Sequence, residues 1–212
     1  MLNHLKQIII KLLLILNNIK VRIRGYEDYF NFPFEVNLPL NQHANTVFLE
    51  SCDILDELGC NYFITDGTIL GIYRDNQFIK HDNDIDVAIF GGFDIDLIIA
   101  RFQEKKYQVG RLVRYKGKVQ QLIFYSNTNV IFDICFWYDH GDGFVYHFVP
   151  EVKSGRRQNI LYYLQKDMVS FLGKNFPTHH QIENWLKEHY GDDWKIPKTV
   201  KGDCREDAKD IL

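Results

Sequence analysis

Apolar residues recur at three- and four-residue intervals in several stretches of the chain, which is typical of amphipathic helices. The clearest stretch, 45–58, is followed by Gly59, a common helix stop. Similar patterns predict helices near 94–104 and near 179–189, and a short helix is expected over 69–74. The helix near 179–189 carries its apolar residues on one face: Ile182, Trp185, Leu186 and Tyr190.

Short runs rich in β-branched and aromatic residues predict strands between and beyond these helices. Two are expected over 62–64 and 84–90. Four more are predicted over 107–115, 119–125, 130–137 and 144–149. The breaks at 116–118 and 126–129 contain Gly, Asn and Ser, the residues of hairpin turns.

The composition suits one folded domain. Of 212 residues, 46% are hydrophobic and 15% aromatic, so the chain can bury a large core without disulfides. A net charge of −3 provides no basic field for phosphates, which disfavours a nucleic-acid binder.

The cysteines show no C-x-x-C pairing, which predicts reduced, mostly buried thiols and a reducing cytoplasm. They are Cys52, Cys60, Cys135 and Cys204. A bridge between Cys52 and Cys60 is the alternative, because a helix-to-strand corner could bring them within bonding distance.

The most apolar stretch is 8–16, which Lys11 interrupts. It is too short to span a bilayer as a helix, which needs about 20 residues. No small-residue cleavage site follows it, so a secretory signal is not expected. Two interpretations stay open for residues 1–24. One is an interfacial helix at the inner face of the membrane, and the other is a helix docked on its own domain in the cytoplasm.

The strand predicted over 84–90 begins with two acids. Asp84 and Asp86 leave the same face, roughly 7 Å apart at their α-carbons, while Ile85 and Val87 point to the other face. This spacing predicts that they share one or two divalent cations. The alternative is a solvated strand entrance.

Asp133 lies inside the apolar run 130–137, where an unpaired carboxylate would be costly. It therefore needs a partner, either the same metal or a buried Arg or Lys. Upstream, Gly67-Thr68 follows a strand and opens a helix. Gly67 is expected to take a positive φ and Thr68 to cap the helix, so that backbone N–H groups and the Thr68 hydroxyl face a phosphate.

These residues carry a family resemblance. Gly67-Thr68 followed by Asp84-Ile85-Asp86-Val87 resembles the signature of the nucleotidyltransferase superfamily that includes polymerase-beta-type enzymes. The longer run 55–86 closely resembles the LicD and fukutin family of phosphotransferases, and Tyr190-Gly191-Asp192-Asp193-Trp194 with Pro197 resembles that family's closing motif.

The resemblance covers residues 45–197 and implies an α+β fold, in which an α/β-type mixed sheet is flanked by helices as in the polymerase-beta-like nucleotidyltransferases. It also implies three segments: an N-terminal helix with a linker over 1–40, a LicD-like domain over 41–197 and a polar tail over 198–212.

Carried over by residue, the resemblance implies that Asp84 and Asp86 bind Mg²⁺, with Mn²⁺ as the alternative. Asp133 completes the site as a metal ligand or as the base toward the acceptor hydroxyl. Arg74 is expected to bind donor phosphate together with Gly67 and Thr68, unless it is a helix-end cation that faces solvent. Asp82 is expected to be a supporting or surface acid.

The sequence also departs from the family pattern. His81 stands where the family usually has Trp, Asn83 where it often has Asp, and Asp66 where Gly or Ser is common. Because the metal pair is intact, these departures bear on substrate choice.

The leading hypothesis is an enzyme that moves a phosphorylated alcohol, such as phosphocholine or a polyol phosphate, from a CDP-linked donor to a glycan or glycolipid hydroxyl, as in lipopolysaccharide or capsule modification, and releases CMP. The alternatives are nucleotidyl transfer from a nucleoside triphosphate, a metal-dependent glycosyltransferase, and a non-enzymatic binding module or membrane-tethered scaffold. The polar stretch 80–83 before the acidic pair disfavours a glycosyltransferase, and the presence of all three acids disfavours a scaffold.

Overall fold

The structure is a computed structural model that describes residues 19–23, 26–31, 38–149 and 154–198. Its strands are β1 (Ile19–Ile23), β2 (Tyr26–Phe30), β3 (Tyr62–Ile64), β4 (Asp84–Phe90), β5 (Gln108–Tyr115), β6 (Lys118–Tyr125), β7 (Ile131–Asp139), β8 (Phe144–Val149), β9 (Ser154–Asn159), β10 (Lys166–Phe171) and β11 (Lys174–His179). Its helices are α2 (Ala44–Glu57), α3 (Asp66–Asp75), α4 (Ile95–Glu104), α5 (Leu161–Leu164) and α6 (Ile182–Tyr190).

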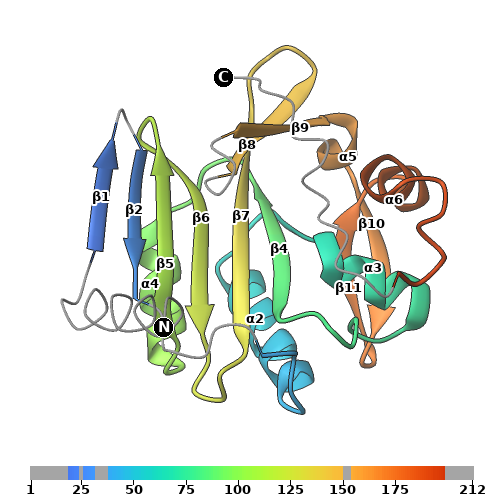
Figure 1. The fold of residues 1–212 in the computed structure, drawn as a ribbon, viewed down its shortest axis with the longest axis horizontal. Helices are drawn as coiled ribbons and strands as arrows, with labels where there is room; N and C mark the ends of the chain where they lie inside the picture. Colours follow the sequence, from blue (N-terminus) through green and yellow to red (C-terminus); the bar gives the residue numbers. More distant parts are fainter. Residues whose placement is uncertain (1–18, 24–25, 32–37, 150–153, 199–212) are drawn as a thin grey trace, which may run out of the picture.

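One mixed sheet joins these strands (Figure 1). The strand order is β1-β2-β5-β6-β7-β4-β3-β11-β10, and β8 and β9 extend from β7. Strand β4 runs parallel to β7, and β11 runs parallel to β3. Because β4 and β7 lie in the middle of the sheet, neighbouring strands hold them on both sides. This confirms the predicted α+β architecture.

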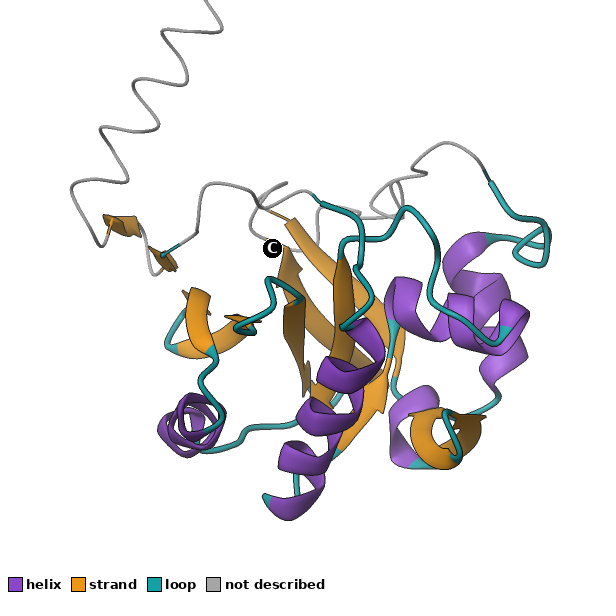
Figure 2. Cartoon of the chain, turned by 90° about the horizontal axis from the view of Figure 1, so that it is seen from below, coloured by secondary structure: helices purple, strands orange, loops and turns teal. Residues whose placement is uncertain are grey.

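The main core lies on the face of the sheet that α2 and α4 cover (Figures 1 and 2). Phe48 of α2 and Phe102 of α4 are fully buried there, and the Phe102 ring stacks on Phe124 with their centroids 4.2 Å apart. Alternate residues of the two central strands point into this core: Ile85, Val87 and Ile89 of β4, and Phe132, Ile134 and Phe136 of β7. The intervening residues of β4 and β7 therefore face the other side of the sheet.

A smaller core covers part of this second face. It joins Phe63, Ala88, Trp137, Val145 and Tyr163. Since Val145 belongs to β8 and Tyr163 to α5, the chain folds back over the sheet after β7. The first residues of β4 and β7 lie on the same face, beyond this smaller core.

The elements with the clearest periodicity are confirmed. Helices α2 and α4 and strands β3 to β8 end within two residues of the predicted positions, and both hairpin turns are present. The C-terminal helix was expected from 179 but begins at Ile182, because His179 is the last residue of β11. Strands β9, β10 and β11 were not predicted.

The structure tests the expectations about the cysteines and about the N-terminal region. Cys52, Cys60 and Cys135 are free thiols, so Cys52 and Cys60 form no bridge; Cys204 lies outside the described residues. The segment 1–40 was expected to be a helix with a linker, whereas residues 19–30 contain the β1–β2 hairpin. The apolar stretch 8–16 lies outside the described residues, and none of the described helices combines the length and apolarity needed to cross a membrane.

The hairpin joins the sheet because β2 pairs with β5, and a buried ion pair fixes this edge. The Arg111 guanidinium donates hydrogen bonds to both carboxylate oxygens of Asp28, at 3.2 and 2.9 Å. Asp28 is 2% exposed and Arg111 8% exposed, so contacts within the protein replace the water around both charges, and the Tyr26 hydroxyl also donates to Asp28.

Removing one partner of this pair is expected to destabilise the protein strongly. Asp28→Ala leaves the Arg111 charge buried without its carboxylate and should lower the free energy of unfolding by about 3–5 kcal/mol, measured by urea denaturation. Asp53→Ala is the matched control, because Asp53 pairs with Lys174 at the exposed surface and its loss should barely change stability. Equal effects of the two substitutions would contradict this role for the Asp28–Arg111 pair.

Candidate active site

Strands β4 and β7 bring acidic side chains together on the second face of the sheet. Asp84 and Asp86 alternate with the buried core residues of β4. In the parallel register Asp86 lies opposite Asp133 of β7. The structure thus places the three acids predicted from the sequence on adjacent strands and on one face.

Asp82 also belongs to this cluster. Asp82, Asp84 and Asp86 each offer a carboxylate oxygen, and the three oxygens lie within 4.8 Å of one another. Asp82 was expected to be a supporting or surface acid, and its role at a metal stays a prediction. A turn explains its position: Asp82 N–H donates to the carbonyl of Ile79, and this turn carries Asp82 to the start of β4.

The electrostatics of the cluster are unfavourable without a cation. Burial raises the pKa of Asp86 well above its usual range, and the nearby carboxylates raise it further. These carboxylates belong to Asp84, Asp66, Asp82 and Asp133. The strongest charges acting on Asp86 are thus of its own sign, so the site favours binding of a cation or a proton.

Asp133 is 7% exposed, and its carboxylate accepts a hydrogen bond from an amide. Gln121 Nε2 on the neighbouring strand β6 donates to Asp133 Oδ2 at 2.6 Å. Asp133 is not one of the three acids whose oxygens lie within 4.8 Å of one another. Its role as metal ligand or base stays a prediction.

The beginning of α3 differs from the expected cap. Asp66, and not Gly67, has the positive φ of 47°, and Thr65 is the N-cap residue. Gly67 is needed for space, because a Cβ atom there would lie 2.3 Å from Asp82 Oδ2. Thr68 is buried inside the helix, and its hydroxyl accepts a 2.7 Å hydrogen bond from Asp86 N–H. The Thr68 hydroxyl therefore ties α3 to β4, and its contact with a phosphate stays a prediction.

Arg74 lies in the last turn of α3, away from the acids at its start. Its guanidinium donates to Asp75 Oδ2 at 2.8 Å and to the carbonyl of Trp194 at 3.4 Å. The side chain is mostly buried, so it is not the solvent-facing cation considered as an alternative. Arg74 joins α3 to the closing motif, and its binding of phosphate stays a prediction.

A second group of polar side chains, not predicted from the sequence, lies at the start of α3. His189 Nε2 is 2.9 Å from Asp66 Oδ1, and the Arg156 guanidinium lies 3.7 Å from the same oxygen. Burial raises the pKa of Asp66, but Arg156 and His189 lower it more, leaving it well below its usual range. Only one feature of the sequence pointed to this group, namely the acid at position 66, where the family commonly has a small residue.

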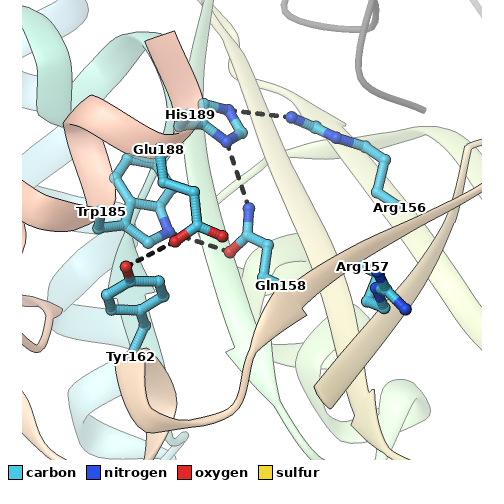
Figure 3. Close-up of a pocket in the computed structure, with 7 residues that line it drawn as sticks. All are labelled: Arg156, Arg157, Gln158, Tyr162, Trp185, Glu188 and His189. Atoms are coloured by element: carbon cyan, nitrogen blue, oxygen red, sulfur yellow. Dashed lines mark hydrogen bonds between the residues drawn. The ribbon is translucent and has the colours of Figure 1, made fainter. Parts of the chain in front are cut away.

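Arg156 and His189 line a cavity of about 130 Å³ between β9 and α6 (Figure 3). Gln158, Tyr162 and Glu188 also contribute to its wall. The Tyr162 hydroxyl donates to Glu188 Oε2 at 2.6 Å. The cavity therefore combines a cation, a carboxylate and an amide beside the residue that opens α3.

Comparison with known proteins gives a match over most of the site. Residues 59–200, more than half of the chain, match the family described as LicD/FKTN/FKRP, nucleotidyltransferase domain. The chain belongs to this family. The matched region begins before β3 and ends beyond α6, so it contains the acids, Arg74, Arg156 and His189.

The curated relatives are members of the same family. The protein named ribitol-5-phosphate transferase FKTN from Macaca fascicularis is 28% identical over 178 residues, covering 81% of this chain and 37% of that protein. The protein of the same name from Homo sapiens is 28% identical over 149 residues, covering 68% of this chain and 31% of that protein. The chain thus spans about a third of the length of these relatives.

Among solved structures, the chain is similar to the lincosamide antibiotic adenylyltransferase LnuA with bound lincomycin. The TM-score is 0.45 at 13% sequence identity, and the superposition covers 70% of this chain and 86% of that one.

Behind the start of α3, aromatic rings form a continuous stack. His179 lies between Phe63 and Trp185, with centroid distances of 5.4 and 4.2 Å, and His189 follows at 4.6 Å from Trp185. His179 Nε2 also lies 3.0 Å from the Thr65 hydroxyl. Burial lowers the pKa of His179 to about 3.

This lowered pKa predicts a loss of stability in mild acid. In the unfolded chain His179 is protonated below about pH 6.5, whereas in the folded protein it is protonated only below about pH 3. The free energy of unfolding of the wild type relative to that of His179→Gln should therefore be greatest above pH ~6.5. It should decrease by about 1.4 kcal/mol for each pH unit below that value. Urea denaturation of both proteins between about pH 7 and 4.5 measures this difference.

His43→Gln provides the control, since His43 is exposed at the N-cap of α2, outside the aromatic stack. The same pH dependence for both substitutions, or a pH-independent difference for His179→Gln, would show that His179 is not buried in the neutral form.

Proposed function

We propose that this protein transfers a phosphorylated alcohol, a polyol phosphate or phosphocholine, from a CDP-linked donor to a glycan or glycolipid hydroxyl, with release of CMP. The observation that carries the proposal is the group of three carboxylate oxygens, from Asp82, Asp84 and Asp86, within 4.8 Å of one another at the start of β4. Family membership supports the reaction class, because the matched relatives are named ribitol-5-phosphate transferases.

The donor set fits Mg²⁺ or Mn²⁺. Carboxylate oxygens are the ligands that these hard cations prefer, and repulsion within the cluster favours a bound cation. Asp82, Asp84 and Asp86 would hold the ion, and Asp133 lies on the adjacent strand to share it. When bound, a divalent cation neutralises charge on the diphosphate and on the departing CMP.

The chain's own residues would position the two substrates. The first N–H groups of α3 have no partner within the helix, so a donor phosphate would bind at this end of α3. Asp133, held by Gln121, would accept the proton of the acceptor hydroxyl if it is not a metal ligand. A glycan acceptor and a location in the cytoplasm or at the inner face of the membrane belong to the same proposal.

The expected reaction with Mg²⁺, a CDP-polyol or CDP-choline donor and a hydroxyl acceptor is CMP release in step with the phosphorylated product. Phosphorus NMR or mass spectrometry of the products measures it. Asp84→Asn and Asp86→Asn should each abolish turnover, because each removes a ligand of the cation that would balance the charge of the diphosphate, and removal of the metal with EDTA should do the same. Melting temperatures without metal should barely fall, since neither side chain belongs to the core.

Asp96→Asn is the control, because Asp96 is exposed on α4 and should leave turnover unchanged. Near wild-type turnover of either site variant would reject the metal assignment. Pyrophosphate release from a nucleoside triphosphate, with no CDP conjugate consumed, would instead favour nucleotidyl transfer.

Gly67→Ala tests the place of Asp82 in the cluster. The new Cβ would lie 2.3 Å from Asp82 Oδ2, so the carboxylate must leave the position that it holds beside Asp84 and Asp86. Affinity for Mn²⁺, measured by calorimetry or electron paramagnetic resonance, should fall by about 10-fold or more while the fold is retained. Gly92→Ala is the matched control, because a Cβ there meets open space. Unchanged Mn²⁺ affinity in Gly67→Ala would remove Asp82 from the proposed ligands.

A further inference from the structure

A chain of hydrogen bonds beneath α6 determines which nitrogen of His189 carries the proton (Figure 3). Trp185 Nε1–H can only donate, and it donates to Gln158 Oε1 at 3.0 Å. This orients the amide so that Gln158 Nε2 donates to His189 Nδ1 at 3.3 Å. Since Nδ1 accepts, the proton lies on Nε2, and His189 Nε2–H donates to Asp66 Oδ1 at 2.9 Å.

The same reasoning defines the role of Arg156. Its Nη2 lies 2.9 Å from His189 Nε2, but both nitrogens carry protons and neither can accept from the other. The two N–H groups instead converge on Asp66 Oδ1. Convergent donors that include a guanidinium are the arrangement that binds a carboxylate or phosphate oxygen. Here an internal carboxylate occupies that position.

Arg74 occupies the opposite end of α3. Eight residues separate it from Asp66, about 12 Å along the helix axis. Its guanidinium binds Asp75 and the Trp194 carbonyl. A diphosphate bound beside Asp82, Asp84 and Asp86 would thus have Arg156 much nearer than Arg74 along α3.

We propose that Arg156, rather than Arg74, is the cation that binds the donor diphosphate at the start of α3, and that Asp66 competes with the diphosphate for the Arg156 guanidinium. This inference rests on the proposed function, which supplies a diphosphate donor. It also gives the unusual acid at position 66 a role, because a carboxylate there opposes binding of the anion until the donor displaces it.

The test is calorimetric binding of inorganic pyrophosphate to the full chain with Mg²⁺ present. Arg156→Gln should weaken binding by about 10-fold or more, the loss expected for a charged hydrogen-bond donor. Arg156→Lys keeps the positive charge but lacks the paired donors of the guanidinium, so it should weaken pyrophosphate binding less than Arg156→Gln. Arg74→Gln should have a smaller effect than Arg156→Gln. Circular dichroism and thermal melting verify that each variant is folded.

Asp66→Asn separates ligand binding from a structural role. Removing the competing carboxylate should increase pyrophosphate affinity, opposite in direction to Arg156→Gln. If Arg156 only holds Asp66 in place, the two substitutions would weaken binding together, and the proposal would be overturned. A larger loss in Arg74→Gln, or no pyrophosphate binding by the wild-type protein, would overturn it as well.

The binding assay needs no turnover, so the two proposals fail separately. If the wild-type protein released no CMP from any CDP conjugate but bound pyrophosphate through Arg156, the donor would be wrong and the diphosphate ligand would stand. If CMP were released but Arg156→Gln bound pyrophosphate as the wild type does, only the role of Arg156 would fail.

Discussion

Repulsion among carboxylates is the constraint on which the site depends. Asp84 and Asp86 leave one face of β4, Asp133 lies beside Asp86, and Asp66 and Asp82 add their charges to the same space. Such a cluster persists only where the backbone that carries it is fixed by other interactions. The opposite face of β4 and β7 provides them, because its alternate residues are buried in the main core.

Helix α3 is held at its start from two sides. On the side of β4, Thr65 N–H donates to the Asp86 carbonyl at 3.3 Å, and Asp86 N–H donates to Thr68 Oγ1 at 2.7 Å. On the side of the C-terminal segment, His179 contacts the Thr65 hydroxyl and His189 donates to Asp66. The helix N-terminus and the acids are thus fixed relative to each other before any ligand binds, which lowers the cost of ordering the site.

The sequence predicted those parts of the fold in which local pattern and tertiary contacts agree, such as α2, β4 and β7. Strand β9 was missed because SGRRQN is polar, and β11 because Pro177 lies within it, although β11 pairs with β3 near Thr178. The acidic pair followed from alternation along one strand. The roles of Asp82 and Thr68 did not, because each depends on a contact between residues that are distant in the sequence.

The two parts of the family signature, more than a hundred residues apart, are joined through α3. His189, one residue before the closing motif, binds Asp66 at the start of the helix, and the Trp194 carbonyl accepts from Arg74 at its end. The C-terminal segment therefore contacts both ends of the helix that faces the acids. This gives a physical reason for the closing motif to accompany the acidic motif: the segment that carries it fixes the helix that faces the acids.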